Sequence, residues 1–542
     1  MRENPFAITL DVGSSLANKT GSWRVERPVY VHRLPPCNQG CPAGEDIQGW
    51  LSLAEEGDGE GAWRRIMEVN PLPAVMGRAC FHPCETACNR AQIDEAVGIN
   101  AVERSLGDRA VRQGWTVPVT APPTGHRVLV VGAGPAGLSA AYHLRLSGHE
   151  VEVRDSAALP GGMLRYGIPA YRLPRDVVDA EVARIEAMGV TLVMGSPVTD
   201  AARALEEEGF DAVFVGVGAQ RGRRAEIPAG DAGRVVDAVS LLHGLEDGSP
   251  AVLGRTVVVY GGGDTAMDAA RTAERLGATE TVVVYRRNRD RMPAHDEEVE
   301  DALAEGVRMR WLSTVSLVEG GRLVVERMEL DADGFPRPTG ELEELEADSL
   351  VLALGQDADL ALLEGVAGVR TDGGVVAVDA DQRTGHPGVF AGGDVVGGER
   401  TITAAVGEGR RAAAAVDAWL DGREPGHPAE RPVATADRLN TWYYEDAPRT
   451  IRPRLEAVRR RSTFDEVVGG LDDEEALFEA RRCLSCGNCF ECDNCFGVCP
   501  DNAVIKLGPG RGDEFDLDFC KGCGICVEEC PCGAIDLVPE PR

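Results

Sequence analysis

Cysteines crowd the C-terminal end of this 542-residue chain at a repeated spacing. Eleven of the sixteen cysteines fall in the last sixty residues. Ten of them form two runs, each of which ends in a three-residue gap before a Cys-Pro pair. The runs read Cys483-x2-Cys486-x2-Cys489-x2-Cys492-x2-Cys495-x3-Cys499-Pro500 and Cys520-x2-Cys523-x2-Cys526-x3-Cys530-Pro531. This pattern strongly restricts the fold of the segment, because thiolates at these intervals hold iron–sulfur clusters.

Two such runs in tandem are typical of a bacterial ferredoxin with two [4Fe–4S] clusters, in which the last cysteine of each run crosses to the other cluster. We predict one cluster on Cys489, Cys492, Cys495 and Cys530, and a second on Cys499, Cys520, Cys523 and Cys526. A zinc ribbon would use two Cys-x2-Cys pairs and no more, and a disulfide scaffold would need export. Three cysteines are surplus to the pattern, and we expect them to pack at the cluster edge or to form a local thiol pair rather than to ligate a third cluster. They are Cys483, Cys486 and Cys532.

Length and charge limit the remaining possibilities. A chain of 542 residues exceeds what one hydrophobic core usually supports, so several domains are expected. The first twenty residues lack the basic start and apolar run of a secretory signal, and no stretch of eighteen apolar residues occurs. Free thiolates for iron favour the reducing cytoplasm. The net charge of −32 would repel nucleic acid and anionic lipid.

The segment HRVLVVGAGPAGLSAAYHLRLSGHEVEVRD has the order strand, glycine turn, helix and strand of a dinucleotide-binding unit. Gly132 permits the tight turn, Gly134 lets the backbone approach a pyrophosphate, and Gly137 lets helix and strand pack closely. The N-terminus of the helix offers amide groups to phosphate. The predicted contacts are Gly132, Gly134, Pro135, Ala136 and Gly137, with Asp155 at the ribose.

A second unit, RTVVVYGGGDTAMDAARTAERLGATETVVVYRR, repeats this geometry with alanine at the third glycine position. Its second strand ends in two arginines where the first unit has an acid. A guanidinium there pairs with the 2′-phosphate of NADP, which a carboxylate would repel. The predicted NADP contacts are Gly261, Gly263, Asp264, Thr265, Ala266, Arg286 and Arg287.

A third segment, GVFAGGDVVGGERTITAAVGEGRRAAAA, favours FAD as the ligand of the first unit. Flavoproteins with two dinucleotide domains place an acid of this motif near the ribityl or pyrophosphate group. The N-terminus of the following helix then points at the isoalloxazine, where its dipole favours the reduced anion. The predicted FAD contacts are Gly393, Asp394, Thr401, Ile402 and Thr403.

The other five cysteines lie in PPCNQGCPAGEDIQGW and GRACFHPCETACNR. Together with GGMLRYGIP, GGGDTAMDAAR, YRRNRDRMPA and AGGD, these motifs make residues 28–425 resemble the small, flavin-bearing subunit of NADPH-dependent glutamate synthase. Relatives of that subunit include the N-terminal half of dihydropyrimidine dehydrogenase and the large subunit of NADH-dependent ferredoxin:NADP oxidoreductase. The terminal ferredoxin segment is foreign to the simple glutamate synthase subunit.

The resemblance implies an N-terminal [4Fe–4S] cluster on Cys41, Cys80, Cys84 and Glu103. A second family cluster would use Cys37, Cys88 and two cysteines eight and five residues before Cys37, where this chain has Val29 and His32. We therefore expect that second cluster to be absent or altered. A single all-cysteine cluster that recruits Cys37 or Cys88, and packed thiols without iron, remain open alternatives.

The resemblance also places the GGMLRYGIP segment, Gly161 to Pro169, along the flavin. The flavin-proximal candidates for the reaction are Gly162, Leu164, Arg165, Tyr166 and Gly167. Hydride transfer from NADPH to FAD depends on positioning more than on acid or base groups, so the lack of a catalytic triad is no objection.

Three functions fit these features. The first is an FAD-dependent oxidoreductase that passes electrons between NADP(H) and ferredoxin or a ferredoxin-dependent partner, such as a 2-oxoacid oxidoreductase. The second is the small subunit of a glutamate synthase, which would need a large partner chain. The third is a non-catalytic assembly subunit with structural clusters.

The expected fold is multidomain α/β with two Rossmann-like domains, the NADPH domain being inserted in the FAD domain. The expected divisions are a helical iron–sulfur domain (1–122), the FAD domain (123–250 and 376–425), the NADPH domain (251–375), a linker (426–480) and an α+β ferredoxin domain (481–542). The strands Val128–Val131 and Val257–Val259 should be buried in the two parallel sheets.

Overall fold

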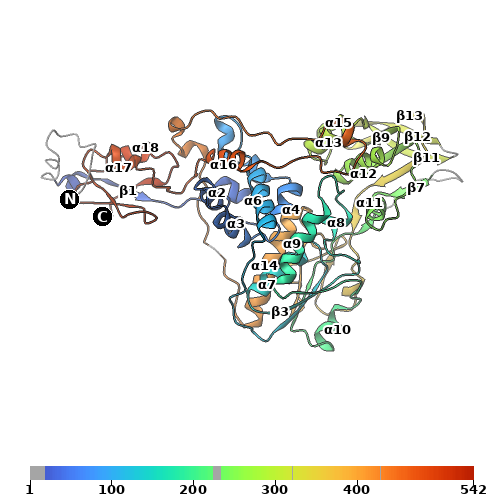
Figure 1. Cartoon of the computed structure of the whole chain (residues 1–542), viewed down its shortest axis with the longest axis horizontal. Helices are drawn as coiled ribbons and strands as arrows, with labels where there is room; N and C mark the ends of the chain where they lie inside the picture. The colour runs from blue at the N-terminus through green and yellow to red at the C-terminus, as the bar shows by residue number, and fades with distance from the viewer. Residues whose placement is uncertain (1–18, 224–233, 320–321, 428, 542) are drawn as a thin grey trace.

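The computed structural model describes residues 19–223, 234–319, 322–427 and 429–541. Figure 1 shows an elongated molecule with the cysteine-rich C-terminal region at one end and the second Rossmann-like region at the other. The N-terminal helices lie between them, beside the first Rossmann-like region. Among the described residues, no helix combines the length and the apolar character needed to cross a bilayer.

The first Rossmann-like region has a five-stranded parallel sheet in the order β18-β5-β2-β3-β4. Strand β2 carries the predicted apolar run, and Val128, Leu129 and Val130 are fully buried, as expected. Helices α7 and α14 pack against each other so closely that a Cβ at Gly409 would lie 2.2 Å from the Ala136 carbonyl oxygen. The elements are β2 (Arg127–Val131), α7 (Pro135–Leu146), β3 (Glu150–Arg154), α8 (Met163–Tyr166), α9 (Arg175–Ala187), β4 (Thr191–Val193), α10 (Ala201–Glu206), β5 (Ala212–Val215), β18 (Val389–Ala391) and α14 (Ile402–Leu420).

The second Rossmann-like region has a parallel sheet in the order β10-β9-β8-β14-β7, beside an antiparallel sheet in the order β11-β12-β13. Val257, Val258 and Val259 of β8 are buried, as predicted. The elements are β7 (Arg234–Asp237), α11 (Ala238–Glu246), β8 (Thr256–Gly261), α12 (Asp264–Arg275), β9 (Glu280–Val284), α13 (Asp296–Ala304), β10 (Arg308–Arg310), β11 (Ser313–Glu319), β12 (Arg322–Leu330), β13 (Pro336–Glu346) and β14 (Ser349–Ala353). One short pair, β6 (Arg221–Gly222) with β15 (Gln356–Asp357), lies where the chain passes between the two regions. A second pair, β16 (Thr371–Asp372) with β17 (Val375–Val376), packs on the first region, since Val376 shares a buried cluster with Leu129 and Val131.

The N-terminal helices form a small domain that buries its contacts with the first Rossmann-like region. The Glu181 carboxylate of α9 accepts hydrogen bonds from the backbone amides of Ala74 (2.9 Å) and Val75 (3.0 Å) in the first turn of α4. The Tyr142 hydroxyl of α7 donates to the Met67 carbonyl at 2.8 Å. The helices are α1 (Pro36–Gly40), α2 (Ile47–Glu55), α3 (Gly59–Met67), α4 (Pro73–Ala79), α5 (Pro83–Thr86) and α6 (Ile99–Gln113).

The two ends of the described chain meet in one small sheet. Strand β1 (Glu26–Tyr30), within the range expected to be helical, pairs antiparallel with β21 (Ile535–Pro539), and Val29 lies opposite Asp536. The segment expected to be a linker contains α15 (Ala457–Arg460) and α16 (Asp473–Arg481), and α16 packs on α2 and α6. A capping box between Asp472 and Glu475 starts α16. The remaining elements are α17 (Asn494–Val498), β19 (Val504–Lys506), β20 (Asp513–Phe515) and α18 (Ile525–Glu528).

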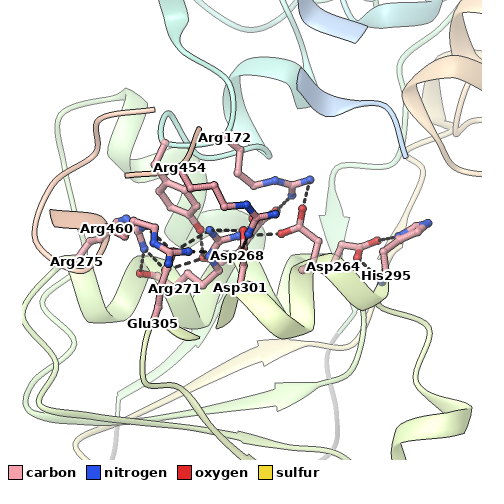
Figure 2. A network of polar contacts seen from close by, with 12 residues as sticks. Arg172, Asp264, Asp268, Arg271, Arg275, His295, Asp301, Glu305, Arg454 and Arg460 are labelled. Carbon is pink, nitrogen blue, oxygen red and sulfur yellow. Dashed lines mark hydrogen bonds and ion pairs between the residues drawn. The ribbon is translucent and has the colours of Figure 1, made fainter. Parts of the chain in front are cut away.

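A buried network of ion pairs fixes the second Rossmann-like region against its neighbours (Figure 2). The Glu305 carboxylate is fully buried and bonds to Arg271 and to Arg275, the shortest contact to each being 2.9 Å and 2.6 Å. Arg172, from the first Rossmann-like region, reaches Asp268 and Glu298 at 2.7 Å each. Arg454 of the C-terminal connector pairs with Asp301. Three parts of the chain are therefore held together by paired buried charges.

Arg271→Ala should destabilise the protein by about 3–5 kcal/mol, because removal of one partner leaves buried carboxylates uncompensated. Urea unfolding followed by circular dichroism should show a lower midpoint. The control is Arg322→Ala, whose partner Glu344 lies 3.2 Å away and which is 65% exposed. That exposed pair should contribute little. Equal midpoints for the two variants would reject a stabilising role for the network.

Candidate functional site

A cleft of about 1160 Å³ lies where the two Rossmann-like regions meet the N-terminal helical domain. It is lined by most of the residues predicted to hold FAD and by the start of the second glycine loop. Those predicted residues are Gly134, Pro135, Ala136, Asp155, Gly162, Gly393, Asp394, Thr401, Ile402, Asp264 and Thr265. Residues 79–81 of the helical domain also reach the cleft through Ala79 and Phe81.

Each of the two glycine loops leaves open space beside its second glycine. Gly132 has φ +108°, and a Cβ there would lie 2.3 Å from the Gly216 carbonyl oxygen. At Gly137 a Cβ would lie 1.8 Å from the Gly132 carbonyl oxygen. Both glycines are thus required by the fold. By contrast, a Cβ at Gly134 would meet only Gly162 Cα at 3.9 Å, and one at Gly263 would meet nothing within 4 Å. The open space at these second glycines fits the approach of a pyrophosphate.

Asp155 lies at the junction between this cleft and a second cavity of about 1030 Å³. Its carboxylate accepts hydrogen bonds from the backbone amides of Ala133 (2.7 Å) and Ala157 (2.8 Å). Gly132 and Val131 line the second cavity as well. Asp155, predicted to contact the ribose, is therefore fixed between the two cavities.

The N-terminus of α14 points into the cleft, as the sequence predicts. Thr401 caps this helix by accepting a hydrogen bond from the Ala404 amide at 3.1 Å. Burial raises the pKa of Asp394, which lines the same wall, and Arg400 opposes that shift. Glu408 accepts a hydrogen bond from the Gly393 amide at 2.6 Å. The positive end of the helix dipole is available to an anionic cofactor here.

The flavin-proximal candidates of the GGMLRYGIP segment lie in different surroundings, and only Gly162 among them lines the cleft. Gly162 contacts the first glycine loop, since a Cβ there would lie 2.8 Å from Gly134 Cα. Leu164 is fully buried and Arg165 pairs with Asp179. Tyr166 stacks on His243 with ring centroids 4.4 Å apart. Gly167 lies at the end of α8. The side chains that reach the cleft from this segment are instead those of Met163 and Ile168, which the sequence analysis did not single out.

The second glycine loop reaches the helical domain through an aromatic contact. The His295 ring donates through Nδ1 to the Asp264 carboxylate, with Nδ1 and Oδ2 3.0 Å apart, and the His295 backbone amide donates to Oδ1 at 2.9 Å. Its ring stacks on Phe81 with centroids 3.4 Å apart and planes 5° from parallel. Phe81 directly follows Cys80. The start of the predicted NADP loop therefore lies beside the cleft, close to the predicted cluster ligand Cys80.

The two arginines predicted to read the 2′-phosphate lie just beyond β9. The Arg286 side chain is exposed, and no ion pair involves it among the described residues. The Arg287 side chain is half-buried, and its Nε is buried without a hydrogen-bond partner. Both groups are free to bind an anion.

The four predicted N-terminal ligands lie near one another, and Cys80 stands between Ala79 and Phe81, which line the cleft. Burial raises the pKa of Cys80 to about 12. The hydrogen bond from Thr403 lowers this pKa, and the nearby Glu103 carboxylate raises it. Burial and Glu45, with a smaller effect of Glu103, raise the pKa of Cys41, and burial and Glu85, again with a smaller effect of Glu103, raise the pKa of Cys84. Since thiols must lose their protons to bind iron, cluster assembly here would release protons.

A second buried carboxylate, Glu45, was missed by the sequence analysis. The Asn70 amide donates to Glu45 and to Glu103 at 2.9 Å each, so the two carboxylates lie close together. Burial raises the pKa of Glu45 to about 7. Its only signal in the sequence is its place four residues after Cys41.

Thr403 joins the predicted flavin site to the N-terminal cysteines. It does not line the cleft, although it was predicted to contact FAD. Its hydroxyl donates to Cys80 Sγ at 2.9 Å from the first turn of α14. The helix whose N-terminus faces the cleft therefore also contacts a predicted iron ligand.

The C-terminal cysteines lie close together in the ferredoxin region, and one predicted set surrounds a single cavity. Cys499, Cys520, Cys523 and Cys526 line one cavity of about 350 Å³. In the other set, burial and then Cys530 raise the pKa of Cys492, and Cys489 and Cys492 contribute to the raised pKa of Cys495. Within the described part of the chain, no three acidic, cysteine or histidine side chains converge as the ligands of a single ion would. Thiolates spread around a cavity fit the corners of a cubane better than a zinc ribbon.

Cys37 and Cys88 lie together, away from Cys80. With them lie Cys483 and Cys486, which were expected at the edge of the ferredoxin clusters. Only Cys532 of the three surplus cysteines lies within the ferredoxin region, with its sulfur 3.8 Å from Cys530 Sγ.

Comparisons with known proteins agree with this arrangement. The family model of pyridine nucleotide-disulphide oxidoreductases matches residues 126–409. The model of dihydropyrimidine dehydrogenase domain II with its 4Fe-4S cluster matches residues 25–115, and the 4Fe-4S binding domain matches residues 513–536.

Three relatives illustrate the similarity. The NADP(+)-dependent formate dehydrogenase subunit beta of Moorella thermoacetica is 36% identical over 83% of this chain and 70% of that protein. The NADPH-Fe(3+) oxidoreductase subunit beta of Geobacter sulfurreducens is 33% identical over 85% of this chain and 77% of that protein. The glutamate synthase [NADPH] small chain of Azospirillum brasilense is 36% identical over 74% of this chain and 89% of that protein.

Gly134→Ala should leave the protein folded but weaken FAD binding about tenfold or more, because the added methyl group enters space that the cofactor needs. Equilibrium binding of FAD to the apoprotein would measure this. Gly137→Ala is the contrasting variant, since its methyl group would meet the Gly132 carbonyl and destabilise the fold itself. Unchanged FAD affinity in Gly134→Ala would contradict the assignment of the loop.

Proposed function

The chain belongs to the pyridine nucleotide-disulphide oxidoreductase family, and we propose that it passes electrons between NADP(H) and ferredoxin or a ferredoxin-dependent partner enzyme. Its matches make it an NADPH-dependent flavin iron–sulfur oxidoreductase, which favours a catalytic chain over a non-catalytic assembly subunit.

One observation carries the proposal: the first glycine loop, the second glycine loop and the segment around Cys80 all meet at a single cleft. Bound FAD would supply the chemistry that takes electrons in pairs from a nicotinamide and releases them singly, as iron–sulfur clusters require. The chain's own part is to position the two nucleotides. Gly134 and Gly162 shape the flavin wall, while Asp264, fixed by His295, borders the nicotinamide side.

The C-terminal region supplies a surface for the partner. Cys489, Cys492 and Cys523 are exposed, whereas Cys495, Cys520 and Cys530 are buried. Each of the two ferredoxin sets therefore has at least one ligand at the molecular surface. Exposed cluster edges favour exchange of single electrons with another protein.

A second candidate is the electron-transfer subunit of an NADPH-dependent glutamate synthase. The Azospirillum brasilense small chain, of which this chain covers 89%, favours it. Residues 426–542 extend beyond the part that resembles that family, and their ferredoxin region favours the first candidate.

Anaerobic stopped-flow mixing of NADPH with the iron-reconstituted protein tests the proposal. We expect flavin bleaching, followed by reduction of an added low-potential ferredoxin. Bleaching without ferredoxin reduction would favour the glutamate synthase alternative, which a large partner chain and glutamate formation would then test. No bleaching would reject both.

Arg286→Ala with Arg287→Ala should raise the KM for NADPH about 100-fold or more, because hydrogen bonds to a charged group contribute about 1.5–3 kcal/mol each and the double variant loses both guanidinium groups. The KM for NADH should change little. Arg308→Ala, an exposed arginine of the neighbouring strand β10, is the control. A similar rise for both coenzymes would contradict recognition of the 2′-phosphate.

Cys523→Ser should leave the rate of flavin bleaching by NADPH unchanged but slow ferredoxin reduction at least about tenfold, because a predicted cluster ligand is lost. Stopped-flow absorbance at flavin and ferredoxin wavelengths separates the two steps. Wild-type ferredoxin reduction in this variant would show that the C-terminal region is not the outlet.

A further inference from the structure

Four cysteines from opposite ends of the chain line one cavity in the helical domain. Cys37 lies in α1 and Cys88 follows α5, while Cys483 and Cys486 follow α16. The cavity has a volume of about 340 Å³, and its other walls include Pro36, Leu51, Val97 and Ile99. All four cysteines are free thiols.

We propose that Cys37, Cys88, Cys483 and Cys486 hold a further [4Fe–4S] cluster. Two ligands come from the helical domain and two from the segment that leads into the ferredoxin region. This ligand set is neither the N-terminal set nor either ferredoxin set.

The ferredoxin region provides an internal standard for this site. The cavity lined by Cys499, Cys520, Cys523 and Cys526 has a volume of about 350 Å³, nearly equal to the 340 Å³ of the cavity lined by Cys37, Cys88, Cys483 and Cys486. Both cavities are enclosed by four cysteines and by mainly apolar neighbours. In the ferredoxin cavity the four cysteines are identified by their spacing in the sequence. In the cavity of the helical domain, four cysteines from distant parts of the chain are brought together by the fold.

The sulfur atoms of the proposed site are surrounded by hydrogen-bond donors. The Ser485 amide lies 3.5 Å from Cys483 Sγ, and the Asn89 side-chain amide lies 3.5 Å from Cys486 Sγ. The backbone amides of Arg90 and Val97 donate to the Cys88 sulfur. Such donors stabilise cluster sulfurs and tune the reduction potential.

Charge at the site also suits thiolates. Arg482 is 2% exposed and directly precedes Cys483. Arg90 lines the cavity and is held in place by Asp94. Buried guanidinium groups next to thiols favour the deprotonated form that iron requires.

The fold explains why the sequence alone did not place these ligands. Val29 is in β1 and pairs with Asp536 in the ferredoxin sheet, and His32 is not among the residues that line the cavity. The stretch before Cys37 is therefore committed to the C-terminal sheet. The connector brings Cys483 and Cys486 to the side of Cys37 and Cys88 that this stretch leaves open.

The proposed cluster lies between the N-terminal set and the ferredoxin region. Cys37 lies in α1 and Cys41 directly follows it, while Cys84 lies in α5 and Cys88 is two residues beyond it. On the other side, the Tyr444 hydroxyl donates to the Leu484 carbonyl at 3.1 Å, and the Gly487 amide donates to the Cys532 carbonyl at 2.6 Å. If the proposed function holds, on which this role rests, the cluster connects the flavin side of the molecule to its outlet.

Iron content and electron paramagnetic resonance test the site without relying on turnover. The full-length protein would be reconstituted anaerobically and reduced with dithionite, in wild type, in Cys483→Ser/Cys486→Ser and in the matched control Cys532→Ser. We expect the double variant to keep its FAD but to lose about four iron atoms per chain and the signal of one cluster. Cys532→Ser should retain both.

The same loss of iron and signal in Cys37→Ser would support the proposal from the other end of the chain. Wild-type iron content in both the double variant and Cys37→Ser would overturn it. Because dithionite replaces NADPH here, a full complement of iron in a protein that does not oxidise NADPH would reject the proposed function and leave the cluster standing.

Discussion

The buried side chain of Arg482 ties the segment that leads into the ferredoxin region to the N-terminal helical domain. Its guanidinium group donates to the backbone carbonyls of Glu95 (2.7 Å) and Ala96 (3.1 Å) and pairs with Glu479 at 2.5 Å. Arg90 returns a hydrogen bond to the Arg482 carbonyl at 3.2 Å. A buried charge this well paired is costly to disturb. The position of Cys483 and Cys486, and through them of the ferredoxin region, depends on these contacts.

A second constraint acts at the other end of the helical domain. Glu181 holds the start of α4, and Thr403 holds Cys80, so the helical domain is fastened to the first Rossmann-like region on both sides of the cleft. The stacked rings of Phe81 and His295 add the second Rossmann-like region. The cleft is therefore formed by three parts of the chain at once. This explains why its walls include side chains, such as Phe81 and Met163, that no single motif contains.

Local sequence motifs correctly predicted features whose geometry is set by a few neighbouring residues. The glycines of the two loops occupy the positions that the dinucleotide fingerprint requires, because a turn of a few residues sets their geometry. The helix start at Thr401 followed from the same kind of reasoning. The flavin-proximal candidates Leu164, Arg165 and Tyr166 show where reasoning from local motifs fails. Proximity to the flavin segment in sequence does not fix which way a side chain points, and these three pack into the protein.

The sequence by itself determined the kind of chemistry in this protein: two dinucleotide loops, arginines in place of an acid after the second, and crossed cysteine runs at the C-terminus. These depend on residue spacings of a few positions, which short turns and helices convert directly into geometry. Only the tertiary structure decided that Cys37 and Cys88 meet Cys483 and Cys486, that β1 pairs with β21, and that Cys80 adjoins the cleft. Those contacts join residues hundreds of positions apart, and they arise from the burial of α16 on α2 and α6 and the pairing of charges around Arg482, which no local pattern encodes.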